Sequence, residues 1–211
     1  MDNRRKHSSQ LPAELTDIKR VDSINILGVT VTNTLTVNEH VDRVLSNCAQ
    51  SVFALKTLRA HGLNRECLQN VFNAVILAKL TYAVSAWIGF TRAAERERIE
   101  AFIRRCKRSE LCSTETKTFA QICEVYDNQL FSKIIRNPCH ILNHLLPPVS
   151  AAAENYSLRP RKHNRLLPER TTRLFDANFI YRNLYCDILL MKSKDYINIV
   201  IDAVAVYQPF I

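Results

Sequence analysis

The alternation of apolar and polar residues predicts a short β-hairpin near the start of the chain. β-Prone residues occupy most positions from Ile24 to Val31 around Gly28, and Asn33-Thr34 has the composition of a turn that closes the pattern. A two-stranded hairpin buries too little apolar surface to be stable alone. We therefore expect this hairpin to be the edge of something larger and the least well-supported ordered element of the chain.

The pattern becomes helical after Thr36. Apolar residues between Val37 and Leu58 advance in steps of three and four, which gives a helix one apolar face. Thr36 and Glu39 have the Thr-x-x-Glu spacing of a capping box, which predicts a helix start at about Val37. The helix should end at His61-Gly62, because glycine adopts the left-handed conformation of a C-cap.

The same periodicity predicts three further helices. One begins after the cap residue Asn64 and ends near Gly89, and its short link to the first helix favours antiparallel packing. The next begins after Thr91 and is the most basic helix of the chain. The last extends from about Thr116 to Leu146, with a break at Asn137-Pro138.

The predicted fold class is therefore mainly α, with a short N-terminal hairpin, a bundle of three to four helices and an irregular basic C-terminal segment. The predicted division of the chain is a basic polar tail (1–23), the hairpin (24–35), the helical bundle (36–148), a linker (149–158), the basic segment (159–187) and an unassigned tail (188–211).

Composition narrows the setting in which such a chain would work. With 211 residues and 47% hydrophobic content it can build a core, and its net charge of +9 favours an anionic partner. Because the positive charge is clustered, we expect nucleic acid ahead of a membrane surface. Seven cysteines without a regular framework, and a basic polar start with no apolar stretch behind it, predict an intracellular protein of the cytoplasm or nucleus.

One apolar run, from Val71 to Phe90, is long enough to be compared with a membrane span. It contains Lys79, and a charge at mid-span costs about 3 kcal/mol. A helix buried in the middle of a bundle also needs to be apolar on most sides, and this interpretation is favoured. We expect no membrane contact.

The residues that catalysis would need are missing from the sequence pattern. No two carboxylates are adjacent to hold a pair of Mg²⁺ ions, and no glycine-rich loop could bind phosphates. The nearest approach to a zinc spacing is Cys139-His140 with His144, but no Cys-x-x-Cys exists, so ordinary buried thiols are favoured. We predict no enzymatic activity, no metal, no cofactor and no small-molecule substrate.

His40-Val41-Asp42 has the His-x-Asp spacing that non-haem iron oxygenases use for Fe(II). On a helix, residues two apart point about 200° away from each other and cannot hold one ion. We expect His40 and Asp42 on the solvated flanks of the first helix.

Two basic segments remain as candidates for binding. On the third helix these are Arg104, Arg105, Lys107 and Arg108, which could follow a phosphate backbone or form an ordinary solvated surface matched by nearby glutamates. From Arg159 to Arg173 six basic residues face one glutamate, which favours anion binding, and the candidates there are Arg159, Arg161, Lys162, His163 and Arg165. Tyr156, His163 and Phe175 could stack on bases or act as packing anchors.

The order of these pieces resembles the C-terminal part of the reverse transcriptase of non-LTR retrotransposons, LINE-type elements of the jockey and CR1 kind. The resemblance rests on four stretches in order, which are ILGVTVTNTLTVNEHV, LKTLRAHGLNRECL, LTYAVSAWIG and YSLRPRKHNRLLPERTTRLFDANFIYRNLY. Together they span roughly residues 24–185, and the residues after Asp187 do not resemble the family.

The resemblance implies the end of a polymerase palm, a thumb-like helical bundle and the family's C-terminal segment. It implies a partner, the backbone of RNA or of an RNA–DNA template-primer. The catalytic aspartates of the family, including its Ala-Asp-Asp motif, would lie before the hairpin, and no position here matches them, so we expect a truncated copy without polymerase activity.

The hairpin-to-tryptophan stretch is also similar to the N-terminal domain of AlkB-homologue DNA-repair proteins, whose oxygenase chemistry these residues do not support. The alternative is a helical interaction or structural protein with no nucleic-acid role.

Overall fold

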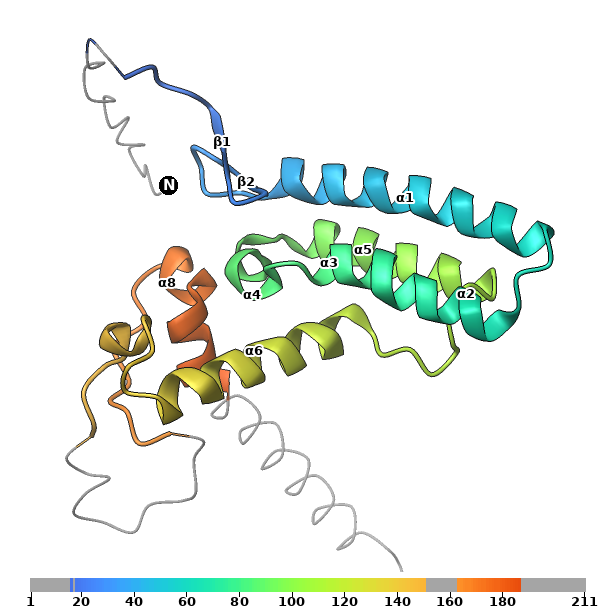
Figure 1. The fold of residues 1–211 in the computed structure, drawn as a ribbon. Helices are drawn as coiled ribbons and strands as arrows, with labels where there is room; N and C mark the ends of the chain where they lie inside the picture. The colour runs from blue at the N-terminus through green and yellow to red at the C-terminus, as the bar shows by residue number, and fades with distance from the viewer. Residues whose placement is uncertain (1–15, 17, 151–162, 187–211) are drawn as a thin grey trace, which may run out of the picture.

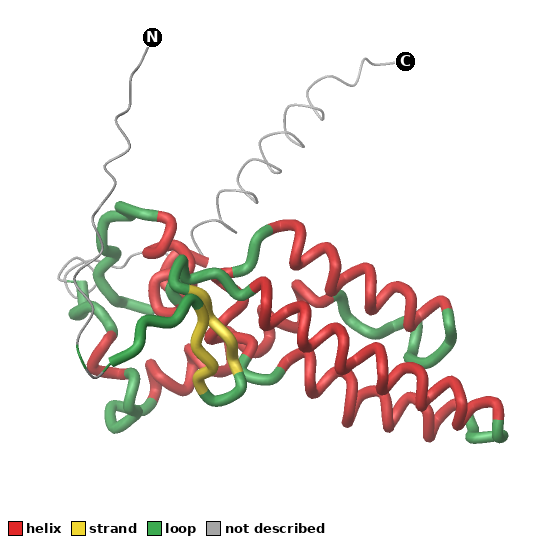
Figure 2. Tube along the Cα trace, turned by 90° about the horizontal axis from the view of Figure 1, so that it is seen from above, coloured by secondary structure: helices red, strands yellow, loops and turns green. Residues whose placement is uncertain are grey.

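The computed structural model describes residue 16, residues 18–150 and residues 163–186. This part of the chain is mainly helical and carries one antiparallel hairpin, so the coarse fold class predicted above is confirmed (Figure 1). Most of the predicted tails and linker, and Arg159, Arg161 and Lys162, lie outside the described residues. Seen from above, the hairpin lies beside one end of the longest helices (Figure 2).

The hairpin consists of β1 (Ser23–Ile26) and β2 (Val29–Thr32), with Ile26 paired with Val29. Leu27 and Gly28 form its turn at φ 47° and 85°, and such a turn requires positive φ at both central residues. The Asn25 carboxamide oxygen accepts a hydrogen bond from the Gly28 N–H at 3.0 Å. Two bonds tie the turn to the helices, because Arg43 donates to the Gly28 carbonyl at 2.7 Å and the Tyr82 hydroxyl to the Leu27 carbonyl at 3.1 Å.

The two strands of the hairpin differ in burial. Val29 is 9% exposed and belongs to the main core, whereas Ile24 and Ile26 on the outer strand are 53% and 55% exposed. Ile24 and Ile26 share a face of the hairpin with Val31 and Val29, the residues they pair with. Their exposure therefore reflects the position of β1, which projects beyond the helices, while β2 packs against α1. The main core is otherwise built from the helices and the loops that follow them, as expected.

The first helix, α1 (Asn38–Ala60), has the predicted extent but not the predicted cap. Val37 occupies the N-cap position without a side-chain hydrogen bond. The Thr36 hydroxyl lies 2.7 Å from the Thr32 hydroxyl and donates to the Asn38 side-chain oxygen at 3.0 Å. The predicted capping box is therefore wrong, because the Thr36 hydroxyl interacts with Thr32 at the end of β2 and with the Asn38 side chain instead of with the first backbone N–H groups of the helix.

The second helix starts as predicted, since the Asn64 side chain accepts the Cys67 N–H at 2.8 Å. Its continuity to Gly89 was predicted wrongly. It divides into α2 (Arg65–Val71), the π-helix η1 (Phe72–Leu77), α3 (Ala78–Thr81), α4 (Val84–Trp87) and the 3₁₀ helix η2 (Ile88–Phe90). Ala83 breaks it at φ 49°, and the Trp87 indole N–H captures the Tyr82 carbonyl that the break leaves free, at 2.9 Å.

The run Arg65–Phe90 is long and apolar enough to cross a membrane by length and composition alone. In this fold its buried side chains join the main core, and Lys79 donates to the Ser51 hydroxyl of α1 at 2.9 Å. The second helical run begins beside the end of α1 and packs along it, and at its far end the Tyr82 hydroxyl reaches Leu27 in the hairpin that precedes α1, so the two run in the predicted antiparallel sense.

α5 (Ala93–Arg108) lies parallel to α1, because Asp42 near the start of α1 pairs with Arg98 and Arg59 near its end donates to the Ser109 carbonyl. α6 (Phe119–Arg136) begins where Glu100 of α5 accepts the Phe119 N–H at 2.8 Å, and then runs back the other way (Figure 1). It ends at the predicted Asn137-Pro138 break.

A second, smaller apolar cluster lies at the far end of α6. Phe131 and Ile134 of α6 pack there with Leu146, Ile180 and Leu184. The surrounding chain contains the 3₁₀ helix η3 (Asn143–Leu145), α8 (Arg173–Ala177) and helical residues 179–186. The C-terminal segment thus has its own packing against α6.

Candidate nucleic-acid interface

The middle of α1 and the C-terminal end of α5 form a shallow groove of about 270 Å³. The groove is lined by Leu45, Ala49, Val52, Lys56, Phe102, Arg105, Cys106 and Ser109, and it contains no carboxylate. The apolar side chains form its floor and the two cations its rim. The Arg105 guanidinium lies 6.0 Å from the Phe102 ring centroid, a cation–π contact that holds the charge along the groove.

Two further arginines follow Lys56 and Arg105 along the same helices. Arg59 lies one turn beyond Lys56 on α1 and reaches across to the Ser109 carbonyl. Arg108 lies one turn beyond Arg105, is exposed, and has no hydrogen-bond or ion-pair partner in the part of the chain that the structure describes. We call Lys56, Arg59, Arg105 and Arg108 the basic seam.

The other two basic residues predicted on α5 are engaged elsewhere. Arg104 pairs with Glu97 at 2.6 Å, and this hydrogen bond, with the charge of Glu97, raises the pKa of Arg104. The Lys107 ammonium donates to the Thr116 carbonyl in the loop before α6. The sequence pattern therefore identified α5 as the basic helix but did not separate its two faces, and it did not point to Lys56 and Arg59. The parallel packing of α1 and α5, which adds them, is a tertiary property.

His163, for which base stacking and a packing role were both considered, lies in a buried, structural environment. It is 7% exposed, its Nε2 donates to the Leu184 carbonyl at 2.9 Å, and its Nδ1 accepts the Arg165 N–H at 3.2 Å. Its ring meets Phe131 edge-on at 5.9 Å. In this position the imidazole is not open to a stacking base.

The other candidates of the C-terminal segment are also engaged within the protein. Arg165 is half-buried and donates to the Pro147 carbonyl at 3.2 Å. Phe175 stacks on Tyr181 with ring centroids 3.8 Å apart. Tyr156, like the three basic residues before His163, lies outside the described residues.

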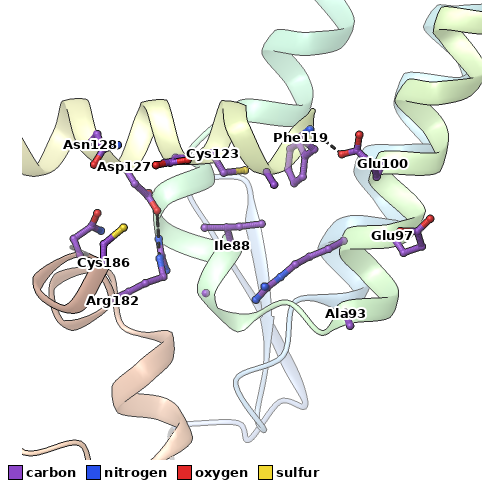
Figure 3. Close-up of a pocket in the computed structure, with 15 residues that line it drawn as sticks. Ile88, Ala93, Glu97, Glu100, Phe119, Cys123, Asp127, Asn128, Arg182 and Cys186 are labelled. Atoms are coloured by element: carbon purple, nitrogen blue, oxygen red, sulfur yellow. Dashed lines mark hydrogen bonds and ion pairs between the residues drawn. The ribbon is translucent and has the colours of Figure 1, made fainter. Parts of the chain in front are cut away.

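A largely buried ion pair, with side chains 25% and 12% exposed, joins the C-terminal segment to α6 (Figure 3). Arg182 donates to one carboxylate oxygen of Asp127, Oδ2, from Nε at 3.2 Å and from Nη2 at 2.7 Å. Arg182 also reaches the carbonyls of Ala177 and Ser85. Sequence reasoning missed this pair, because its partners are 55 residues apart and neither stands in a charge cluster.

The histidine and cysteine candidates do not converge on an ion. Among the described residues no group of three or more His, Cys, Asp or Glu could hold a metal. Burial raises the pKa of Cys48 to about 11 and those of Cys106 and Cys123 to about 12, so these thiols stay protonated and are poor ligands.

His40 is a correction. It was expected on a solvated flank, but it is 3% exposed and meets Trp87 edge-on at 5.1 Å, because the first turn of α1 packs against that indole. Asp42 instead pairs with Arg98 at the surface. The two side chains therefore point apart, as the helix spacing predicted.

Fold and site together define a mainly helical protein with a basic seam at one end of its bundle. No family model matches the chain, and no curated protein or solved structure matches it either.

Proposed function

We propose that this chain is a nucleic-acid-binding segment of a non-LTR retrotransposon reverse transcriptase, corresponding to the end of the palm, the thumb and the C-terminal part. Its thumb-like bundle would hold the sugar-phosphate backbone of an RNA–DNA template-primer. The observation that carries the proposal is the basic seam, in which Lys56 and Arg105 line a groove without carboxylates and Arg59 and Arg108 follow one turn further along the same two parallel helices.

Electrostatics supports a backbone contact in preference to base readout. Lys56 and Arg105 line the groove, and Arg59 and Arg108 are the basic residues one helical turn further along each helix. Cations on such a surface bind phosphates and release counterions, which gives affinity with little dependence on sequence. Arg105 and Arg108 form no ion pair among the described residues, so neither has to give up a carboxylate to bind phosphate.

The hairpin supports the same origin. Its inner strand packs on the bundle, while its outer strand exposes Ile24 and Ile26. This is the arrangement expected at the edge of a larger sheet. We expect no primer extension by the chain itself, because none of its residues matches the family's catalytic aspartates.

A salt titration tests the proposal. The full chain is titrated into a fluorescently labelled RNA–DNA hybrid at several salt concentrations, and the anisotropy gives the dissociation constant. If all four cations contact phosphates, log K should fall with log salt at a slope of about −3.6. No binding at low salt, or binding insensitive to salt, would contradict the proposal.

A charge-matched pair of variants locates the contact. Arg105→Gln with Arg108→Gln should weaken binding and make the slope shallower by about 2. Lys133→Gln with Arg136→Gln removes the same charge from the last turn of α6, at the other end of the bundle, and should change affinity much less (Figure 1). Equal losses from both pairs would mean nonspecific attraction to a basic protein, which would favour the alternative of a helical interaction or structural protein.

A further inference from the structure

One aromatic ring beside the basic seam is left uncovered by the fold. Phe53 of α1 is 74% exposed, whereas every other phenylalanine that the structure describes is buried or half-buried. Its side chain belongs to neither of the two apolar clusters of the described residues. Packing inside the protein therefore does not account for this ring.

Phe53 continues the apolar floor of the groove out to the surface. Ala49, four residues before it, lines the groove, and Lys56, three residues after it, is one of the cations of the basic seam. Residues three and four apart are neighbours on a helix surface, and a long side chain leans toward the turn before it, which directs the ring toward Ala49. The ring therefore lies at the edge of the groove.

The part of α1 around the ring carries no negative charge. Gln50 and Thr57 complete the four helical neighbours of Phe53, and both are exposed and uncharged. The sequence contains no Asp or Glu from Arg43 to the end of α1 at Ala60, and no carboxylate lines the groove. A strand of phosphates can therefore pass beside the ring without repulsion from this helix.

A positive groove with an uncovered ring at its edge is suited to single-stranded nucleic acid. Proteins that bind single strands hold the backbone with cations and stack bases on aromatic side chains, with little dependence on sequence. In a duplex the faces of the bases are stacked on one another, so the ring would have no ligand there. An unpaired strand exposes the faces of its bases, and its phosphates can still reach the basic seam.

We infer that Phe53 stacks on a base of an unpaired strand that leaves the RNA–DNA duplex at the basic seam. The inference rests on the proposed function, because Lys56 and Arg105 must hold phosphates of the same nucleic acid. The preferred partner is accordingly a hybrid with a single-stranded extension in place of a blunt one. Stacking adds affinity without reading the sequence of the extension.

Three ligands separate stacking from phosphate binding. Anisotropy titrations of the full chain at one salt concentration compare a blunt RNA–DNA hybrid, the hybrid with a single-stranded extension at each end in turn, and the hybrid with an abasic extension, which keeps the phosphates but has no bases. The extension with bases should bind at least about fivefold more tightly than the abasic one at one of the two ends. Equal binding at both ends would overturn the inference alone, whereas failure of every hybrid to bind would overturn the proposed function with it.

Variants at exposed positions keep the test independent of folding. Phe53→Ala should lower the affinity for the extended hybrid to that for the abasic one, and should leave the affinity and salt slope of the blunt hybrid unchanged. Phe53→Tyr keeps a ring and should keep the gain. Ile141→Ala is the control, because Ile141 is 78% exposed and lies beyond the end of α6. Equal losses from the two alanine variants, or an equal loss for the blunt hybrid, would overturn the inference.

Phe53→Trp reports the contact directly. The one tryptophan of the chain, Trp87, is 1% exposed, so its emission is a background that the parent chain measures. The introduced indole should be quenched by the extended hybrid and not by the abasic one, and the absence of quenching at saturation would overturn stacking. A second copy of the chain is the competing occupant of the ring. A dimer in sedimentation equilibrium that Phe53→Ala dissociates would overturn the inference in favour of self-association.

Discussion

Arginine has different roles at the two ends of this molecule. In the basic seam, Arg105 and Arg108 are exposed and form no ion pair among the described residues. In the C-terminal segment, Arg165 binds the Pro147 carbonyl, Arg170 pairs with Asp176 and lies over the Tyr185 ring, and Arg182 is held by Asp127. A run of arginines in a sequence therefore does not distinguish a binding surface from a set of structural bonds.

Arg182 should have the largest effect on stability of any arginine in this comparison. Its replacement in Arg182→Met leaves the carboxylate of Asp127 buried and unpaired, which costs about 3–5 kcal/mol of unfolding free energy. Urea unfolding followed by circular dichroism measures the loss.

Two controls separate the buried pair from arginine in general. Arg170→Met removes a pair whose side chains are 41% and 45% exposed, and should cost far less than Arg182→Met because solvent screens the pair. The double variant Arg182→Met with Asp127→Leu should recover more than half of the loss, because no unpaired charge remains. A loss below about 1 kcal/mol for Arg182→Met alone would mean that the pair does not hold the segment in place.

Gly89 tests the same junction without a change of charge. A Cβ there would lie 1.9 Å from the Ala177 carbonyl oxygen and 2.4 Å from Nη1 of Arg182. We expect Gly89→Ala to push α8 away from η2 and to cost about 1–3 kcal/mol, with faster proteolysis after residue 163.

Gly62→Ala is the matched control for that clash. Gly62 has φ 91°, and no other part of the protein lies within 4 Å of the point that a Cβ would occupy, so alanine there brings backbone strain alone. It should cost about 1 kcal/mol and leave the proteolysis of the C-terminal segment unchanged. Equal proteolysis of the two variants would contradict a close contact at Gly89.

Sequence periodicity predicted the helices, because each one buries a single apolar face. The Asn64 cap and the Asn137-Pro138 break were predicted from the residues themselves, because both are local features. It could not predict the break at Ala83, where a buried indole replaces the missing helical hydrogen bond. Asp127 and Arg182 were missed for a related reason, since only the fold brings them together. Of the candidate interface, the sequence indicated only the basic helix α5, because the place of Lys56 and Arg59 beside it depends on how α1 packs.

The buried His40 makes the stability of the fold depend on pH. Burial, with a smaller contribution from the charge of Arg43, lowers the pKa of His40 below its ordinary 6.5. The unfolded chain therefore takes up a proton first on acidification, so the stability from neutral His40 is complete above pH 6.5 and decreases as the pH falls from 6.5 toward the folded pKa. Unfolding free energies measured from about pH 7.5 down to about pH 5 should show this decrease.

His40→Phe checks the assignment, because phenylalanine can keep the edge-on contact with Trp87 but cannot take up a proton. The difference in stability between this variant and the parent should grow in favour of the variant below pH 6.5. If both proteins lose stability in parallel, His40 does not carry the effect.

The smallest change in stability should come from the seam itself. Arg105→Gln with Arg108→Gln removes two exposed charges that form no ion pair among the described residues, so the unfolding free energy should change by less than about 0.5 kcal/mol. Relief of repulsion between like charges in the last turn opposes the loss of their favourable interaction with the helix C-terminus, which keeps the sum small. Circular dichroism and urea unfolding measure it on the same preparation used for the RNA–DNA titration. A loss above about 2 kcal/mol would place these arginines with Arg182 as structural residues, and the contrast between the two ends of the molecule would then fail.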